Sequence, residues 1–181
     1  MSRVPQIDYA TAPAAVRGAH DAHLARQGRI TNMKRTLLQS PPAFHALMEW
    51  YPLRDEVRPF LGDRLTTLYA HAISSETDCL ICGTFFRRIL IDSGEDPDAL
   101  VLSEAEREVV AFGRALAQSP HRVPDEVFAP LARRFTPEQL VALTAFGALM
   151  VATNVVNNAL EVPLDDYLEP YRKPAAHEAA R

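Results

Sequence analysis

Glycine and cysteine are scarce in this chain of 181 residues, with seven and two residues, whereas proline is frequent, with 14. Few glycines leave few positions for tight β-turns, and many prolines suit helix ends and the loops between helices. This composition disfavours an all-β fold. Apolar residues make up 48% of the chain and charged residues 23%, which is typical of a globular protein that buries a core.

The chain also lacks an excess of positive charge and a long apolar run. Lys and Arg number 19 against 23 Asp and Glu, so the formal charge of −4 offers no field that attracts nucleic-acid phosphates. The longest apolar stretch, residues 140–156, is interrupted by polar side chains and falls short of the ~20 residues of a membrane span. The first residues do not resemble a secretory signal. We therefore expect a cytoplasmic protein with neither nucleic acid nor membrane as a partner.

Apolar residues recur at three- and four-residue spacing in segments separated by proline-marked loops, which predicts helices and no strand. Ser103 with Glu106 and Thr136 with Gln139 have the spacing of a capping box, so each pair is predicted to open a helix. Pro52 is expected to close the helix before it. The predicted helices cover residues 14–26, 32–39, 42–50, 63–74, 79–91, 103–117, 124–134 and 136–160.

These helices are expected to form one all-α domain over residues 28–170, with a helical extension at 1–27 and a tail at 171–181. The last helix is apolar on nearly every side between residues 140 and 156. A small domain rarely buries a helix all round by itself. We therefore expect subunits of a homo-oligomer to share this helix.

The only two cysteines stand at CxxC spacing, Cys79 and Cys82, at the predicted start of a helix with Thr77 or Asp78 as its N-cap. Cysteines at i and i+3 share a helical face, and a helix N-terminus stabilises a thiolate, so the pair fits a redox dithiol. The Asp78 carboxylate opposes thiolate formation. Two alternatives are small side chains packed in the core and half of a zinc site, although no second CxxC or nearby histidine pair completes the latter.

Three separated segments resemble the carboxymuconolactone decarboxylase and alkyl hydroperoxidase D family, in its peroxidase-related branch. They are RLTTLYAHAISSETDCLICGTFFRRILIDSG around the cysteines, FTPEQLVALTAFGALMVATNVVNNALEVPLDDYL near the C-terminus, and RITNMKRTLLQSPPAFHAL upstream. The second segment contains the cluster Asn154, Asn157 and Asn158. The resemblance implies an all-α, alkyl hydroperoxidase D-like bundle with a CxxC helical hairpin at its core, assembled as a trimer or a hexamer.

The resemblance also implies roles for the two thiols. In the peroxidase pattern, the second cysteine attacks the peroxide and the first resolves it as a disulfide, which assigns these roles to Cys82 and Cys79. A Glu twelve residues before the first cysteine and a His four residues after the second relay protons in that pattern. Thr67 and Phe86 occupy those two positions here, so the relay is altered.

Other side chains are candidates for the missing groups. His71, one turn after Thr67, is a candidate catalytic base, and a helix-surface histidine is the alternative. Glu76, three residues before Cys79, is a candidate proton acceptor if the connecting loop folds back over the sulfurs, and a solvated loop carboxylate is the alternative. Trp50 and Tyr51 are expected either to line a pocket or to pack in the core.

The sequence thus predicts an antioxidant thiol oxidoreductase that acts on a peroxide or another small molecule and is regenerated by an unidentified thiol reductant, with no cofactor and no metal. A carboxymuconolactone decarboxylase-like enzyme, in which Arg87 and Arg88 would meet an acidic substrate, is an alternative. A non-catalytic member of the same fold is another.

Overall fold

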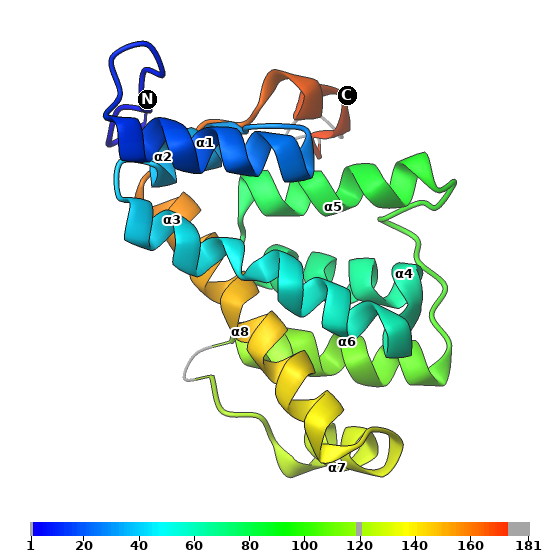
Figure 1. The fold of residues 1–181 in the computed structure, drawn as a ribbon. Coiled ribbons are helices and arrows are strands. Elements are labelled where there is room, and N and C mark those ends of the chain that lie inside the picture. Colours follow the sequence, from blue (N-terminus) through cyan, green and yellow to red (C-terminus); the bar gives the residue numbers. More distant parts are fainter. Residues whose placement is uncertain (1, 119–120, 174–181) are drawn as a thin grey trace, which may run out of the picture.

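The computed structural model describes residues 2–118 and 121–173, and all the regular structure in these ranges is helical (Figure 1). This confirms the predicted all-α class. The elements in chain order are α1 (Ala14–Gln27), α2 (Asn32–Leu37), α3 (Pro41–Met48), α4 (Trp50–Glu76), α5 (Leu80–Asp92), α6 (Glu104–Ala117), α7 (Asp125–Arg134), α8 (Pro137–Ala159) and the short 3-10 helix η1 (Asp166–Tyr171). The predicted tail beyond residue 173 lies outside the described residues.

Both predicted capping boxes are present. The Ser103 hydroxyl accepts a hydrogen bond from the Glu106 backbone N–H, and the Glu106 carboxylate accepts one from the Ser103 N–H at 2.8 Å. Thr136 and Gln139 make the same reciprocal pair at the start of α8. Each pair satisfies two of the backbone N–H groups that a helix N-terminus leaves without partners, so both helices begin where the sequence predicts.

The prediction that Pro52 ends a helix is wrong. Pro52 lies in the first turn of α4, where proline is tolerated because the N–H that it lacks has no intrahelical partner. The chain instead changes direction at Gly62, whose φ of 79° and ψ of 165° interrupt the helical backbone. Residues 50–61 and 63–76 are therefore two helical segments joined at a glycine.

The core forms around α4, which packs against α5, α6 and α8. Tyr69 of α4 is completely buried, with its ring stacked near Phe112 and Phe146 and its hydroxyl donating to the Leu143 carbonyl at 3.1 Å. Close approach of α8 requires Gly147, because a Cβ there would lie 2.2 Å from the Tyr69 hydroxyl. The central helices are thereby fixed relative to one another, and they carry the functional site.

The N-terminal segment forms a second apolar cluster with α2 and α3. Val16 of α1 packs with Leu38 and Phe44, and Arg35 of α2 donates to the Gln6 side chain at 2.8 Å. In Figure 1 this layer and the orange-red η1 lie at the same end of the molecule as α5. Of these elements, η1 packs directly against α5.

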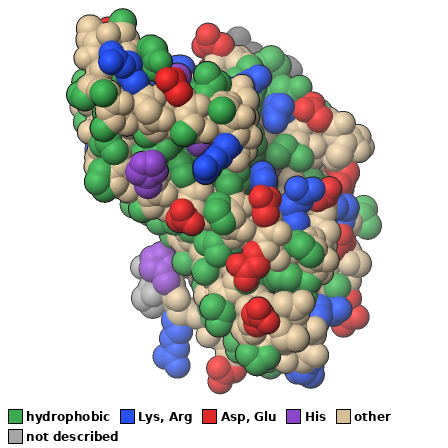
Figure 2. Space-filling view, in the orientation of Figure 1, with side chains coloured by type: hydrophobic (Ala, Val, Ile, Leu, Met, Phe, Trp, Pro, Cys, Tyr) green, Lys and Arg blue, Asp and Glu red, His purple; other side chains and the backbone are tan. Residues whose placement is uncertain are grey.

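One described helix, α8, is long and apolar enough to cross a membrane when judged by length and composition alone, and 39% of its most apolar window is buried in the chain. Its other side remains exposed, with Val141 at 70% and Val155 at 56% exposure. On the face shown in Figure 2, acidic and basic side chains are interspersed.

Candidate functional site

The two cysteines lie where the chain passes from α4 to α5. After α4 ends, Asp78 adopts the left-handed conformation with φ of 49°, and Cys79 is extended and caps α5. The predicted N-cap, Thr77 or Asp78, is therefore wrong by one or two residues, and the cap is the cysteine itself. The Cys79 N–H donates to the Ser74 carbonyl at 3.0 Å, which fixes this turn against the end of α4. Both thiols are buried and reduced.

Asparagines of α8 hold this junction. Asn157 donates through Nδ2 to the Cys82 sulfur at 3.4 Å and to the Cys79 sulfur at 3.9 Å. Asn154 donates to the Thr77 hydroxyl at 2.8 Å, and Asn158 donates to the Thr77 carbonyl at 2.9 Å. The asparagine cluster noted in the sequence thus has two tasks: two members fix the turn and the third contacts both sulfurs.

The two thiols differ in acidity. The Cys82 thiol, together with backbone N–H groups at the start of α5 and the Asn157 amide, lowers the pKa of Cys79 to about 7 against the effect of burial. The hydrogen bond to Cys79 and burial raise the pKa of Cys82 well above its ordinary value. Near neutral pH, Cys79 therefore titrates between thiol and thiolate, whereas Cys82 keeps its proton.

Cys82 lines a cavity of about 130 Å³, here called the aromatic cavity. Its walls include five aromatic side chains, from Trp50, Tyr51, Phe85, Phe86 and Tyr167. Trp50 and Tyr51 are pocket walls, as one of the two sequence interpretations expected. Phe86, at the position of the missing histidine, faces the same cavity as Cys82.

A lysine and a carboxylate that the sequence did not single out also line the aromatic cavity. Burial lowers the pKa of Lys34 to about 8 despite the attraction of Asp165, and burial raises the pKa of Asp165. One Asp165 oxygen accepts from the Asn32 N–H at 2.9 Å, and the other is buried without a partner among the described residues. Perturbed charged groups in a cavity with a thiol are typical of functional sites.

No local sequence signal marks these two groups. Lys34 resembles an ordinary basic residue of an amphipathic helix, and Asp165 lies 131 positions further along the chain. Only the docking of the segment after α8 onto α2 brings them to the same cavity. Their burial and altered pKa values follow from that tertiary contact.

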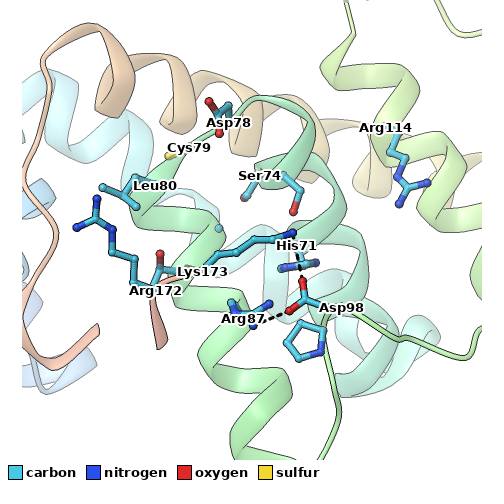
Figure 3. A pocket seen from close by; sticks show the side chains of 14 residues that line it. His71, Ser74, Asp78, Cys79, Leu80, Arg87, Asp98, Arg114, Arg172 and Lys173 are labelled. Carbon is cyan, nitrogen blue, oxygen red and sulfur yellow. Dashed lines mark ion pairs between the residues drawn. The ribbon is translucent and has the colours of Figure 1, made fainter. Parts of the chain in front are cut away.

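Cys79 and His71 line a second and larger cavity, of about 910 Å³, here called the basic cavity (Figure 3). The structure does not place His71 in the cavity of Cys82. Burial, with Arg87 nearby, lowers the pKa of His71 to about 4, so its ring is neutral at pH 7. Thr67 lines neither cavity and donates its hydroxyl to the Asp63 carbonyl.

The remaining candidates have other partners. Glu76 lines neither cavity, and it accepts a hydrogen bond from Gln118 at 3.2 Å. Arg87 forms an ion pair with Asp98 at 2.7 Å, and the Arg88 guanidinium lies over the Tyr167 ring. Within residues 2–118 and 121–173, no group of three histidines, cysteines or acidic residues is placed to hold a metal ion.

No protein-family model matches the chain, and no curated protein matches it. Among solved structures, an uncharacterized peroxidase-related protein of Ralstonia eutropha JMP134 with an alkylhydroperoxidase AhpD core is 21% identical, with a TM-score of 0.71. The match covers 96% of this chain and 98% of that one.

The debrominase Bmp8 has the same architecture. A cysteine-to-alanine variant in complex with 2,3,4-tribromopyrrole is 20% identical with a TM-score of 0.76, and the match covers 94% of this chain and 97% of that one. The apo form gives 20% identity, a TM-score of 0.74 and coverage of 92% and 94%. This chain therefore has the all-α, alkyl hydroperoxidase D-like fold.

Proposed function

We propose that this protein is a cytoplasmic thiol-dependent oxidoreductase whose Cys79 and Cys82 reduce a small apolar organic hydroperoxide. The observation that carries the proposal is a pair of thiols that both accept from the Asn157 amide and have opposite pKa shifts, one of which lines a cavity with aromatic walls. Such walls favour an apolar substrate, and the small volume of about 130 Å³ favours a short one.

The paired thiols supply the base that the sequence lacks at positions 67 and 86. The Cys82 proton passes to the Cys79 thiolate, and the Cys82 sulfur then attacks the outer peroxide oxygen. The O–O bond breaks, Cys82 becomes a sulfenic acid, and the alkoxide takes a proton from Lys34, whose pKa of about 8 suits an acid near neutral pH.

The second half of the reaction closes the disulfide. Cys79, whose pKa is about 7, releases its proton to solvent, Lys34 takes a proton from solvent, and the Cys79 thiolate attacks the Cys82 sulfur. The S–O bond breaks, and hydroxide leaves as water after taking a proton from solvent. The dithiol is oxidised by two electrons, and the hydroperoxide is reduced to an alcohol and water. Asn157 stabilises the sulfur that carries the charge at each stage.

The test follows free thiols and sulfenic acid after mixing with cumene hydroperoxide. We expect wild type to lose both thiols, Cys79→Ser to stop at a sulfenic acid that dimedone traps on Cys82, and Cys82→Ser to react far more slowly. Hydrogen peroxide should react more slowly than cumene hydroperoxide because it gains nothing from apolar walls. Retention of both wild-type thiols would exclude the redox function and favour a non-catalytic or decarboxylase-like protein.

A second candidate substrate is a small halogenated aromatic compound. The aromatic walls of the cavity favour it, as does the shared architecture with a debrominase. The same dithiol would supply two electrons, replacing the C–Br bond by C–H, releasing bromide and forming the disulfide. Bromide release from 2,3,4-tribromopyrrole by the reduced protein, and none by Cys82→Ser, would favour this substrate over a hydroperoxide.

A further inference from the structure

The two thiols line different cavities. Cys82 lines the aromatic cavity, whereas Cys79 lines the basic cavity, together with side chains from α4, α5, α6 and the segment after η1. A dithiol that has been oxidised at the aromatic cavity must be reduced again before the next turnover. The basic cavity gives the reductant a separate route to the same disulfide.

Charge distinguishes the basic cavity from the rest of the molecule. Four basic side chains line it, Arg87, Arg114, Arg172 and Lys173, against the two carboxylates Asp78 and Asp98. The lining is thus net positive in a chain whose formal charge is −4.

The positive charge is only partly neutralised within the cavity. Asp98 is shared by Arg87 at 2.7 Å and Lys173 at 3.2 Å. Arg114, which lines the cavity from α6, makes no ion pair within residues 2–118 and 121–173 (Figure 3). Cationic side chains that converge from separate elements on a concave surface concentrate anions there.

We propose that the basic cavity binds a low-molecular-weight thiol that carries carboxylate groups, and that this thiol reduces the disulfide from the Cys79 side. The inference rests on the proposed redox function and extends it to the reductant. The volume of about 910 Å³ suits a ligand of the size of a short peptide, for which the aromatic cavity of about 130 Å³ is too small.

The reduction takes two steps and two thiols. The first thiolate attacks the Cys79 sulfur, the disulfide breaks, and Cys82 leaves and takes a proton. A second thiolate then attacks the sulfur of the bound thiol, releasing the oxidised reductant and the Cys79 thiolate. The low pKa of Cys79 makes it a good leaving group in this step. The disulfide gains two electrons, and two thiols become one disulfide.

The experiment measures reduction of the disulfide in the full chain after oxidation with diamide, so that it does not depend on any substrate. The probes are glutathione as the anionic thiol, mercaptoethanol as the neutral one and cysteamine as the cationic one. We expect Arg114→Gln to lower the rate of disulfide reduction by glutathione by at least about threefold relative to the rate with mercaptoethanol. The rate of reduction by cysteamine should fall less or rise. Added salt should reduce the advantage of glutathione.

Arg133→Gln provides the matched control, because it removes the same charge from an exposed position on α7 outside the basic cavity. It should leave the ratio of glutathione to mercaptoethanol rates unchanged. If Arg114→Gln changed the rates of disulfide reduction by all three thiols equally, the proposal of an anionic thiol reductant would be overturned, while the proposed redox function would stand. Failure of diamide to form the disulfide would overturn the redox function itself. An Arg114 dependence seen only with an acidic dithiol protein such as thioredoxin would replace the small thiol by a protein partner.

Discussion

At the scale of single residues, the site depends on how one negative charge is divided between two sulfurs. Asn157 contacts both of them from α8, while its own oxygen is buried without a partner in the described part of the chain. An amide that donates to sulfur favours the thiolate. The side chain therefore stabilises the reactive form of the pair, at the cost of one unsatisfied carbonyl oxygen.

Asn157→Asp replaces this donor by a carboxylate of the same shape. A negative charge beside the sulfurs raises the pKa of Cys79, so alkylation by iodoacetamide at pH 7 should slow by roughly fivefold or more. Asn158→Asp is the control, because Asn158 donates to the Thr77 carbonyl and to neither sulfur. Equal rates in the two variants would contradict the contact between Asn157 and the thiols.

Phe86→His should place an imidazole on the wall of the aromatic cavity beside Cys82. General-base assistance contributes ~10²- to 10⁴-fold, so we expect oxidation by cumene hydroperoxide to accelerate by at least about tenfold in stopped-flow measurements. Thr67→Glu should have little effect, because Thr67 lines neither cavity. A comparable acceleration from Thr67→Glu alone would show that α4 presents position 67 to the cysteines.

The CxxC spacing made the two thiols candidates, because spacing within one helix is a local property. The asparagine cluster and the positions of Thr67 and Phe86 were noted only through the family resemblance. It did not identify Lys34 and Asp165, because their role depends on burial and on contact between segments far apart in the chain. His71 lines the basic cavity together with Cys79, and it does not line the aromatic cavity of Cys82.

At the scale of elements, the direction of α4 depends on Gly62. Its backbone conformation is almost restricted to glycine, so Gly62→Ala should lower the free energy of unfolding by about 1–3 kcal/mol. Gly18→Ala is the control, because Gly18 is exposed within α1 with normal helical backbone and open space around its Cβ position. That change should stabilise by about 0.4–1 kcal/mol. Urea denaturation measures both, and equal effects would contradict the strained geometry.

Packing of α1 against α3 and α4 makes stability depend on pH. His23 is buried between Phe44 and Tyr51, and burial lowers its pKa to about 4. Because the unfolded chain binds this proton near pH 6.5 and the folded chain does not, the contribution to stability is complete above pH 6.5 and is lost as pH falls toward 4.

His23→Leu should therefore reduce the loss of unfolding free energy between pH 7 and about 4.5 in urea titrations. Part of the pH dependence of the unfolding free energy should remain in this variant, because the pKa of His71 is also lowered to about 4. His45→Leu is the control because His45 is an exposed histidine of α3. A pH dependence reduced to the same extent in both variants would contradict the buried, neutral state of His23.

Helix boundaries were predictable where capping chemistry is local, as at Ser103 and Thr136, and less so where proline has two meanings. Proline is found both at the ends of helices and in their first turn. The residues next to Pro52 do not distinguish these two positions, and the position becomes clear only from the tertiary packing of Trp50 and Tyr51. Cys79 as its own cap follows from the left-handed turn at Asp78, a conformation that the sequence does not indicate.

At the scale of the whole molecule, α8 is a helix whose apolar surface a single chain covers only in part. Val141, Ala148, Ala152 and Val155 are exposed and recur at helical spacing along one side, while the opposite side packs in the core. The sequence predicted a helix that one domain does not cover, and an exposed apolar side agrees with that expectation. A partner subunit that covers it would remove this surface from water.

Sedimentation velocity at micromolar concentration tests whether the exposed side of α8 joins subunits. We expect wild type to sediment as a trimer or a hexamer, and Val141→Glu with Val155→Glu to shift it toward monomer, because two charges would be buried in the interface without partners. Val101→Glu is the control: Val101 is 86% exposed in the loop before α6, so its change should leave the assembly intact. Circular dichroism of each variant separates dissociation from unfolding. A monomeric wild type, or an unchanged assembly in the double variant, would contradict this role of α8.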